Sequence, residues 1–139
     1  MKRFSLLVAI LLLAVAAPAA AEPKDGPGGN PVAHGIPDDV AHKLGLTAER
    51  QHHIGDAVFE ANRALIDLEA TQKKAQMDLE KELRAQAPDE AKVMQLVVAV
   101  GQAEIAVRKN RLGLQLKTRK LLGPELWERV LVETGSVKH

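Results

Sequence analysis

The sequence of 139 residues has no cysteine and no tyrosine, and only two phenylalanines and one tryptophan. Without cysteine the chain has no disulfide and no thiol that could act as a nucleophile or metal ligand. The scarcity of aromatic residues argues against a sheet sandwich, in which aromatic and β-branched side chains dominate. The apolar 46% of the chain consists mainly of Ala, Leu, Val and Ile, and this composition predicts an all-α fold.

Serine, the other common nucleophile, is almost absent as well. After residue 21 the only serine is Ser136. A nucleophilic triad needs a hydroxyl or thiol placed next to a base, and carboxylates on solvated helix faces rarely perform acid–base chemistry. The sequence therefore predicts a protein that is not an enzyme.

A strong excess of charge is also missing, because 19 Lys and Arg residues are balanced by 18 Asp and Glu residues. Proteins that bind nucleic acid usually carry a marked positive excess that neutralises phosphates. Nucleic acid is therefore not an expected partner of this chain.

The first 21 residues have the pattern of a secretory signal peptide. Lys2 and Arg3 provide the positive start, residues 4–17 are uncharged, and small residues precede a cleavage point after Ala21. The alternative is an uncleaved membrane anchor, but a spanning helix needs about 20 apolar residues. We expect cleavage, a periplasmic location, and a mature chain of 17 basic and 18 acidic residues without a membrane-spanning segment.

The rest of the chain divides into three predicted parts. Residues 22–37 contain four of the seven prolines and four of the ten glycines without any periodicity, which predicts a flexible leader. Residues 38–133 are rich in strong helix formers and form the predicted helical-hairpin domain. Residues 134–139 are a short tail.

Caps and breakers locate the helices of this domain. Asp38 and Asp39 are predicted to cap a short helix that Gly45 ends, and Thr47 is predicted to cap a long one. Pro88 interrupts the following helical run. The expected helices cover residues 39–44, 48–86, 89–122 and 124–133.

The two long helices have similar lengths and a tight connection, which predicts an antiparallel hairpin. With the turn near residues 87–88, facing positions have numbers that sum to 175. The apolar pairs are Ile54 with Leu121, Ala61 with Leu114, Leu68 with Val107, Ala75 with Val100, and Leu79 with Leu96. The same register predicts polar layers in which Val58 faces Lys117, Leu65 faces Asn110, and Gln72 faces Ala103.

A seam between two helices is too narrow to stabilise a domain alone. Several apolar residues lie off the predicted seam and need cover: Phe59, Ile66, Met94, Val97, Ile105 and Leu112. We therefore predict a homodimer, packing by the two short end helices, or both.

Two short motifs stand at the two ends of the predicted hairpin. The first is Leu46-Thr47-Ala48-Glu49-Arg50-Gln51, and the second is Leu122-Gly123-Pro124-Glu125-Leu126. They resemble the paired LTxxQ boxes of the Spy/CpxP-like family and the related heavy-metal-resistance, or periplasmic metal-sensor, domain. The second box has Gly123 in place of the Thr and Leu126 in place of the Gln. Its motif residues are Leu122, Pro124 and Glu125. The resemblance covers residues 37–132.

This resemblance implies a helical hairpin and three roles. They are an ATP-independent chaperone for unfolded clients, a modulator of a membrane sensor protein, and a metal sensor or buffer. A structural or adaptor coiled coil without metal or chaperone activity is the alternative.

Metal binding is the chemistry that the residue types favour most. Glu49 and His53 are four residues apart, and so are His52 and Asp56, which places each pair on one helix face. Imidazole and carboxylate ligands suit Zn, Ni or Cu. His42 is a more remote candidate, and the other two histidines are His34 and His139. The alternative is that all these side chains are solvated surface residues.

A second candidate surface is the basic part of the second long helix, which contains no acid between Glu104 and Glu125. Its cations are Arg108, Lys109, Arg111, Lys117, Arg119 and Lys120. Interleaved Leu112, Leu114 and Leu116 would make this stretch both cationic and apolar, as suits acidic unfolded chains. The alternative is that these cations pair with acids on the first long helix.

Overall fold

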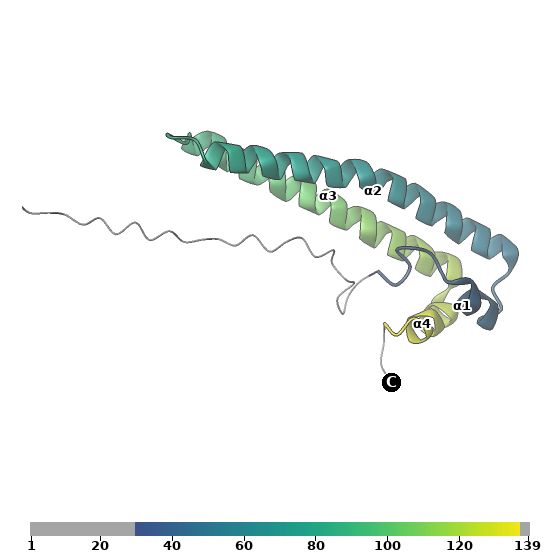
Figure 1. The fold of residues 1–139 in the computed structure, drawn as a ribbon. Coiled ribbons are helices and arrows are strands. Elements are labelled where there is room, and N and C mark those ends of the chain that lie inside the picture. The colour runs from purple at the N-terminus through teal and green to yellow at the C-terminus, as the bar shows by residue number, and fades with distance from the viewer. Residues whose placement is uncertain (1–29, 137–139) are drawn as a thin grey trace, which may run out of the picture.

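A computed structural model describes residues 30–136. The predicted signal peptide (1–21), residues 22–29 of the predicted leader, and His139 lie outside the described residues. Within residues 30–136 the chain forms four helices and no strand, which confirms the all-α prediction (Figure 1). The helices are α1 (Asp38–Lys43), α2 (Ala48–Leu83), α3 (Glu90–Leu122) and α4 (Pro124–Glu133). None of these helices is long and apolar enough to cross a membrane.

Helices α2 and α3 run side by side as the predicted antiparallel hairpin (Figure 1). Helix α2 ends at Leu83, three residues before the predicted end. Pro88 disfavours helical geometry in the residue before it, so residues 84–89 form the turn. The Asp89 side chain then caps α3 by accepting a hydrogen bond of 3.2 Å from the Lys92 amide.

The seam of the hairpin has the predicted composition. All ten residues of the five predicted pairs are buried or half-buried. The predicted layer of Val58 with Lys117 is wrong, because Lys117 is exposed and Thr118 is fully buried. Burying a hydroxyl costs much less than burying an ammonium group, which favours turning Thr118 inward.

The best-packed part of the molecule lies at the open end of the hairpin, where α1 and α4 come together (Figure 1). Its buried side chains come from the segment before α1, from α1 and the loop after it, from the start of α2, from the end of α3, and from α4. They are Val32, Val40, Ala41, Leu44, Leu46, Ile54, Leu122, Trp127 and Val130. We call these nine residues the end-cap core. The short helices cover only this end of the hairpin. The off-seam residues for which the sequence predicted cover stay exposed in the described chain: Phe59, Ile66, Met94, Val97, Ile105 and Leu112.

The end of the predicted leader is packed rather than flexible. Val32 is 0% exposed. The Asn62 side-chain amide donates to the Ala33 carbonyl over 3.2 Å, and the Asn30 side-chain amide donates to the Arg111 carbonyl over 3.2 Å. One buried valine and two amides hold this aperiodic segment against α2 and α3, and periodicity cannot reveal such contacts.

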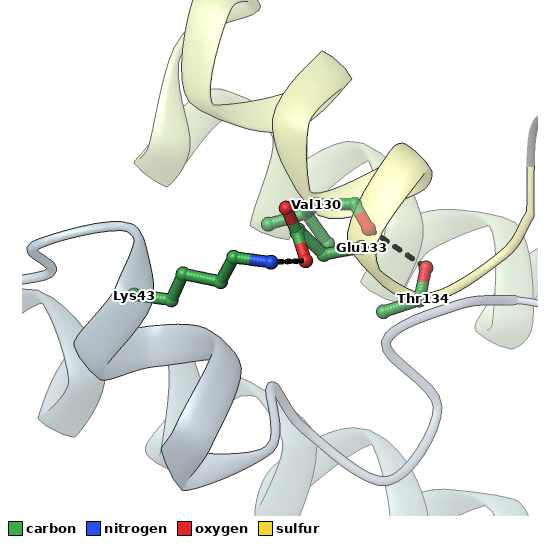
Figure 2. A network of polar contacts seen from close by, with 4 residues as sticks. All are labelled: Lys43, Val130, Glu133 and Thr134. Atoms are coloured by element: carbon green, nitrogen blue, oxygen red, sulfur yellow. Dashed lines mark hydrogen bonds and ion pairs between the residues drawn. The ribbon is translucent and has the colours of Figure 1, made fainter. Parts of the chain in front are cut away.

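Polar contacts join the two short helices of the end cap. Figure 2 shows the Lys43 ammonium of α1 paired with the Glu133 carboxylate at the end of α4. In the same view the Thr134 hydroxyl donates to the Val130 carbonyl over 2.8 Å and completes the last turn of α4. Helix α1 starts at Asp38 without a side-chain cap, so the predicted capping by aspartate is wrong. Both aspartates lie in the first turn, where negative charge favours the helix dipole.

Candidate functional site

The two predicted boxes lie where each long helix meets the end cap. Leu46 and Leu122 are buried in the end-cap core. The Thr47 hydroxyl accepts a hydrogen bond of 3.3 Å from the Arg50 amide and caps α2. The Gln51 amide group donates to the Leu46 carbonyl over 2.9 Å. These contacts fix the start of α2 and hence the direction of the histidines that follow.

The second box starts α4 in a different way. Pro124 occupies the first turn, where its missing N–H is not needed. Glu125 adds negative charge at the same end. Gly123 has a φ of 79°, a conformation that side chains strongly disfavour, which explains a glycine where the first box has Thr47. This box therefore serves the fold, since its leucine and proline turn the chain into the end cap.

The candidate metal ligands lie on the first turns of α2, as two histidine–carboxylate pairs. His52 Nε2 lies 3.5 Å from Asp56 Oδ2, and His53 Nε2 lies 3.7 Å from Glu49 Oε1. The two imidazole rings have centroids 6.3 Å apart and are tilted by 46°. All four side chains are more than half exposed. An ion could reach either pair directly from solvent.

Each pair supplies two donors of types that suit a transition metal. No group of three or more His, Asp or Glu residues that could hold a metal ion occurs within residues 30–136. His42 is exposed in the last turn of α1 and belongs to no such group. The donors fit a metal by type but not by number in one chain. Water or a second protein chain would have to complete the coordination.

The basic stretch of α3 is displayed on the surface. All six predicted cations are exposed. Among residues 30–136, only Arg111 of these six has a carboxylate partner, Glu69, at 2.8 Å. In the part of the chain that the structure describes, the other five cations lie beyond 4.0 Å from any carboxylate oxygen. Pairing with acids of α2 therefore accounts for one of the six.

The leucines among these cations divide between two faces. Leu112 and Leu116 are 51% and 64% exposed, whereas Leu114 is 5% exposed and belongs to the seam. The predicted contribution of Leu114 to a surface patch is wrong, because two residues along a helix correspond to roughly 200° of rotation. The exposed cations and the two outer leucines together form a cationic and apolar surface on α3.

A groove of about 480 Å³ between residues 34–38 and α2 was not predicted. Its wall includes the buried Ile54, the exposed Phe59, and Gly55, around which there is open space. His34 also lines the groove, away from the other histidines. The groove exists because residues 30–37 fold back onto α2. No sequence signal beyond the isolated Val32 announces that contact.

The sequence family agrees with this architecture, since the family described as heavy-metal resistance matches residues 4–129. The chain belongs to the heavy-metal resistance family. This family is part of the Spy/CpxP-like LTxxQ group, as the two boxes predicted, and its members are typically periplasmic. No curated protein and no solved structure matches the chain. For a heavy-metal resistance protein, the paired histidines and carboxylates of α2 become the first candidates for metal contact.

Proposed function

We propose that this protein is a non-enzymatic, periplasmic accessory of heavy-metal resistance that captures a divalent transition metal at the start of α2. The main observation behind this proposal is that two exposed histidine–carboxylate pairs lie next to each other on α2 in a chain of this family. Imidazole nitrogen and carboxylate oxygen together suit Zn, Ni or Cu. The nucleophile-poor composition supports a binding role without catalysis.

Because its side chains are exposed, the proposed site suits rapid exchange of metal ions with solvent better than long-term storage of metal. Ligands on a solvated helix face keep their water until an ion arrives, and no side chain has to move away first. Two donors per pair bind more weakly than the closed four-ligand set of a structural zinc site. Such a weak site would fill only when metal is in excess. A metal buffer needs this property, and so does a protein that reports metal to a membrane sensor protein.

Calorimetric titration of the purified protein with Zn, Ni and Cu salts tests this proposal. We expect binding in the micromolar range that is lost in the His52→Ala/His53→Ala double variant. The matched control is His34→Ala/His42→Ala, which also removes two exposed histidines and should bind like the wild type. Binding that survives in the first variant, or no binding by the wild type, contradicts the proposal.

A second candidate function is ATP-independent binding of unfolded clients by the basic surface of α3. The observation that favours it is a group of five exposed cations that have no carboxylate partner in the described part of the chain and lie on the same helix as the exposed Leu112 and Leu116. Cations attract acidic chains over a distance, and the leucines add weak apolar contact.

Light scattering of an unfolding client at equimolar protein, without ATP, tests this second function. We expect the wild type to slow aggregation and the Arg108→Glu/Lys109→Glu/Arg111→Glu variant to lose most of that effect. Lys73→Glu/Lys74→Glu changes exposed cations on α2 and should remain active. Equal activity of the two variants excludes the basic surface as the client site. A protein inactive in both the metal and client assays would be a structural or adaptor coiled coil.

A further inference from the structure

The groove between residues 34–38 and α2 takes no part in the functions proposed above. Its α2 side is one stripe along the helix: Gln51, Ile54, Gly55, Val58, Phe59 and Asn62. At roughly 1.5 Å per residue this stripe is about 16 Å long, so the groove volume of about 480 Å³ is drawn out along the helix. An extended chain of about five residues has the same length. The shape of the groove therefore suits an extended segment better than a compact ligand.

The α2 side of the groove has an apolar part with free space above it. Ile54 is buried there, whereas Phe59 is 64% exposed. Gly55 lies next to Ile54, and a Cβ atom at this position would meet nothing within 4 Å in the described chain. A glycine in the interior of a helix is destabilising, and no close neighbour within residues 30–136 requires one here. The missing side chain leaves room for an apolar side chain of a ligand beside Phe59.

The opposite side of the groove carries main-chain groups without partners. Within residues 30–136, the carbonyls of residues 34–36 accept no hydrogen bond, and the N–H groups of His34 and Ile36 donate none. On α2, the Gln51 and Asn62 side-chain amides donate to protein carbonyls over 2.9 Å and 3.2 Å, which leaves their oxygens as acceptors. A peptide main chain offers one donor and one acceptor per residue. Its groups match those along this groove.

The charge around the groove is negative. Residues 34–62 contain five acidic residues and only two basic ones, Lys43 and Arg50. Lys43 is paired with Glu133, and Arg50 is half-buried. Asp38 lines the groove, and in the described part of the chain its carboxylate lies beyond 4.0 Å from any Lys, Arg or His nitrogen. A cationic ligand is attracted to such a surface.

We propose that the groove binds an extended peptide segment of a partner protein that carries an apolar residue and a Lys or Arg on the same side of its chain. Alternate side chains of an extended chain point to the same side. The apolar side chain enters the space over Gly55 beside Phe59, and the cation reaches Asp38. The peptide main chain bonds to the free groups of residues 34–36. The groove and the basic surface of α3 thus select peptides of opposite charge.

Fluorescence anisotropy of a labelled test peptide, Lys-Ser-Phe-Ser-Lys with blocked ends, gives the first test. A chelator in the buffer keeps the measurement independent of the proposed metal site. We expect saturable binding that Gly55→Leu weakens by about tenfold, because the new side chain fills the space for the phenylalanine. The matched control is Gly113→Leu, which adds the same side chain at an exposed glycine of α3 with open space around it and should bind like the wild type. Circular dichroism checks that both variants keep their helices.

Changes of charge and of the peptide main chain test the chemistry of recognition. Asp38→Asn should weaken binding about threefold, since an exposed charge pair contributes modestly. Asp67→Asn removes an exposed carboxylate farther along α2 and should have no effect. The acidic peptide Glu-Ser-Phe-Ser-Glu should bind more weakly than the basic one. A basic peptide with methylated backbone nitrogens should lose most of its affinity, because main-chain hydrogen bonds give affinity in this mode of recognition.

Nuclear magnetic resonance locates the bound peptide. The amide signals of residues 34–36 and 51–62 should shift on addition of Lys-Ser-Phe-Ser-Lys, and those of residues 70–100 should stay in place. Shifts confined to α3 would place the peptide on another surface and overturn the proposal.

Three further results would overturn it. A wild-type protein that does not bind the basic peptide at millimolar concentration has no such site. Equal binding by Gly55→Leu and the wild type, or equal binding of the acidic and basic peptides, shows that the groove is not what recognises them. Much tighter binding after deletion of residues 137–139 would make the end of this chain, and not a partner, the occupant. Metal titration without peptide remains a separate measurement, so either proposal can fail alone.

Discussion

The two ends of the hairpin differ in how the same kinds of residues are packed. At the open end, α1 and α4 pack against the long helices, and nine side chains form the end-cap core. Toward the turn, only two helices face each other, and no residue between 58 and 102 is buried, although both helices are continuous there. The comparison shows that regular helices do not make a core by themselves. A helix with one neighbour buries one narrow stripe, and a third element has to cover the rest.

The largest expected effect comes from removing the centre of the end-cap core. Trp127 is 4% exposed, and Trp127→Ala should lower the free energy of unfolding by about 3–5 kcal/mol through lost burial and a cavity. Leu79→Ala, at a half-buried seam position near the turn, should cost only about 1 kcal/mol. Urea denaturation followed by circular dichroism, at one fixed protein concentration, measures both values. Equal losses would show that the two ends contribute alike.

A smaller effect, of opposite sign, is expected at Thr118. Its hydroxyl is fully buried and has no hydrogen-bond partner within the described residues. Thr118→Val keeps the shape and removes the unsatisfied group, so it should raise the free energy of unfolding by about 1 kcal/mol. Thr71→Val is the control, since that exposed hydroxyl donates to the Asp67 carbonyl over 2.8 Å. A loss of stability in Thr118→Val would mean that the hydroxyl has a bound partner.

The smallest effect is expected at the turn, where a polar contact replaces apolar packing. Glu82 Oε2 lies 2.6 Å from Lys92 Nζ, and Glu82 Oε1 accepts a hydrogen bond of 3.2 Å from the Asp89 amide. The hydrogen bond from Lys92, followed by that from the Asp89 amide, lowers the pKa of Glu82. The hydrogen bond to Glu82 raises the pKa of Lys92. These two contacts join the helices across the turn.

The sign of the pH dependence follows from these directions. Because the pKa of Glu82 is lowered by folding, its stabilisation is present above the ordinary value of 4.5 and is lost as the pH falls through the folded pKa. The contribution of Lys92, whose pKa is raised, is lost only as the pH rises through its folded pKa in the alkaline range. Glu82→Gln should therefore lower Tm slightly at neutral pH and lose this difference in acid.

Thermal melts between acid and neutral pH measure this difference. Glu80→Gln is the matched control, because Glu80 forms only an exposed pair with Arg84 within α2, at 3.5 Å. Surface pairs of that kind contribute little, so its Tm should follow the wild type at every pH. A Glu82→Gln variant that melts like the wild type at neutral pH would show that the contact across the turn does not contribute to stability.

Much of the fold could be predicted because its signals are local. Thr47 and Asp89 cap the long helices, and Pro88 separates them. Steps of three and four residues identified the seam, and the α4 boundaries agreed with those predicted from Pro124 and Gly135. The sequence did not predict that Thr118, rather than Lys117, faces the seam. Pairing positions by a fixed sum does not distinguish adjacent residues, and only the higher cost of desolvating an ammonium group favours Thr118.

The candidate sites were predictable to different degrees. The histidine–carboxylate pairs follow directly from a spacing of four residues on one helix. The pairing of Arg111 with Glu69 depends on how the two long helices pack against each other. The groove lined by Phe59 depends on contacts between residues far apart in the chain, such as Ala33 with Asn62.

The sequence by itself determined four helices, the caps of the two long ones, the reversal at Pro88 and the ligand types on α2, because each of these depends on neighbours within a few residues. The tertiary structure decided that Val32 joins the end-cap core, that Thr118 is buried, and that Ile105 of α3 remains more than half exposed within residues 30–136. Burial is a property of surfaces that meet in space. Side chains of the same kind become core or surface according to whether a third element reaches them.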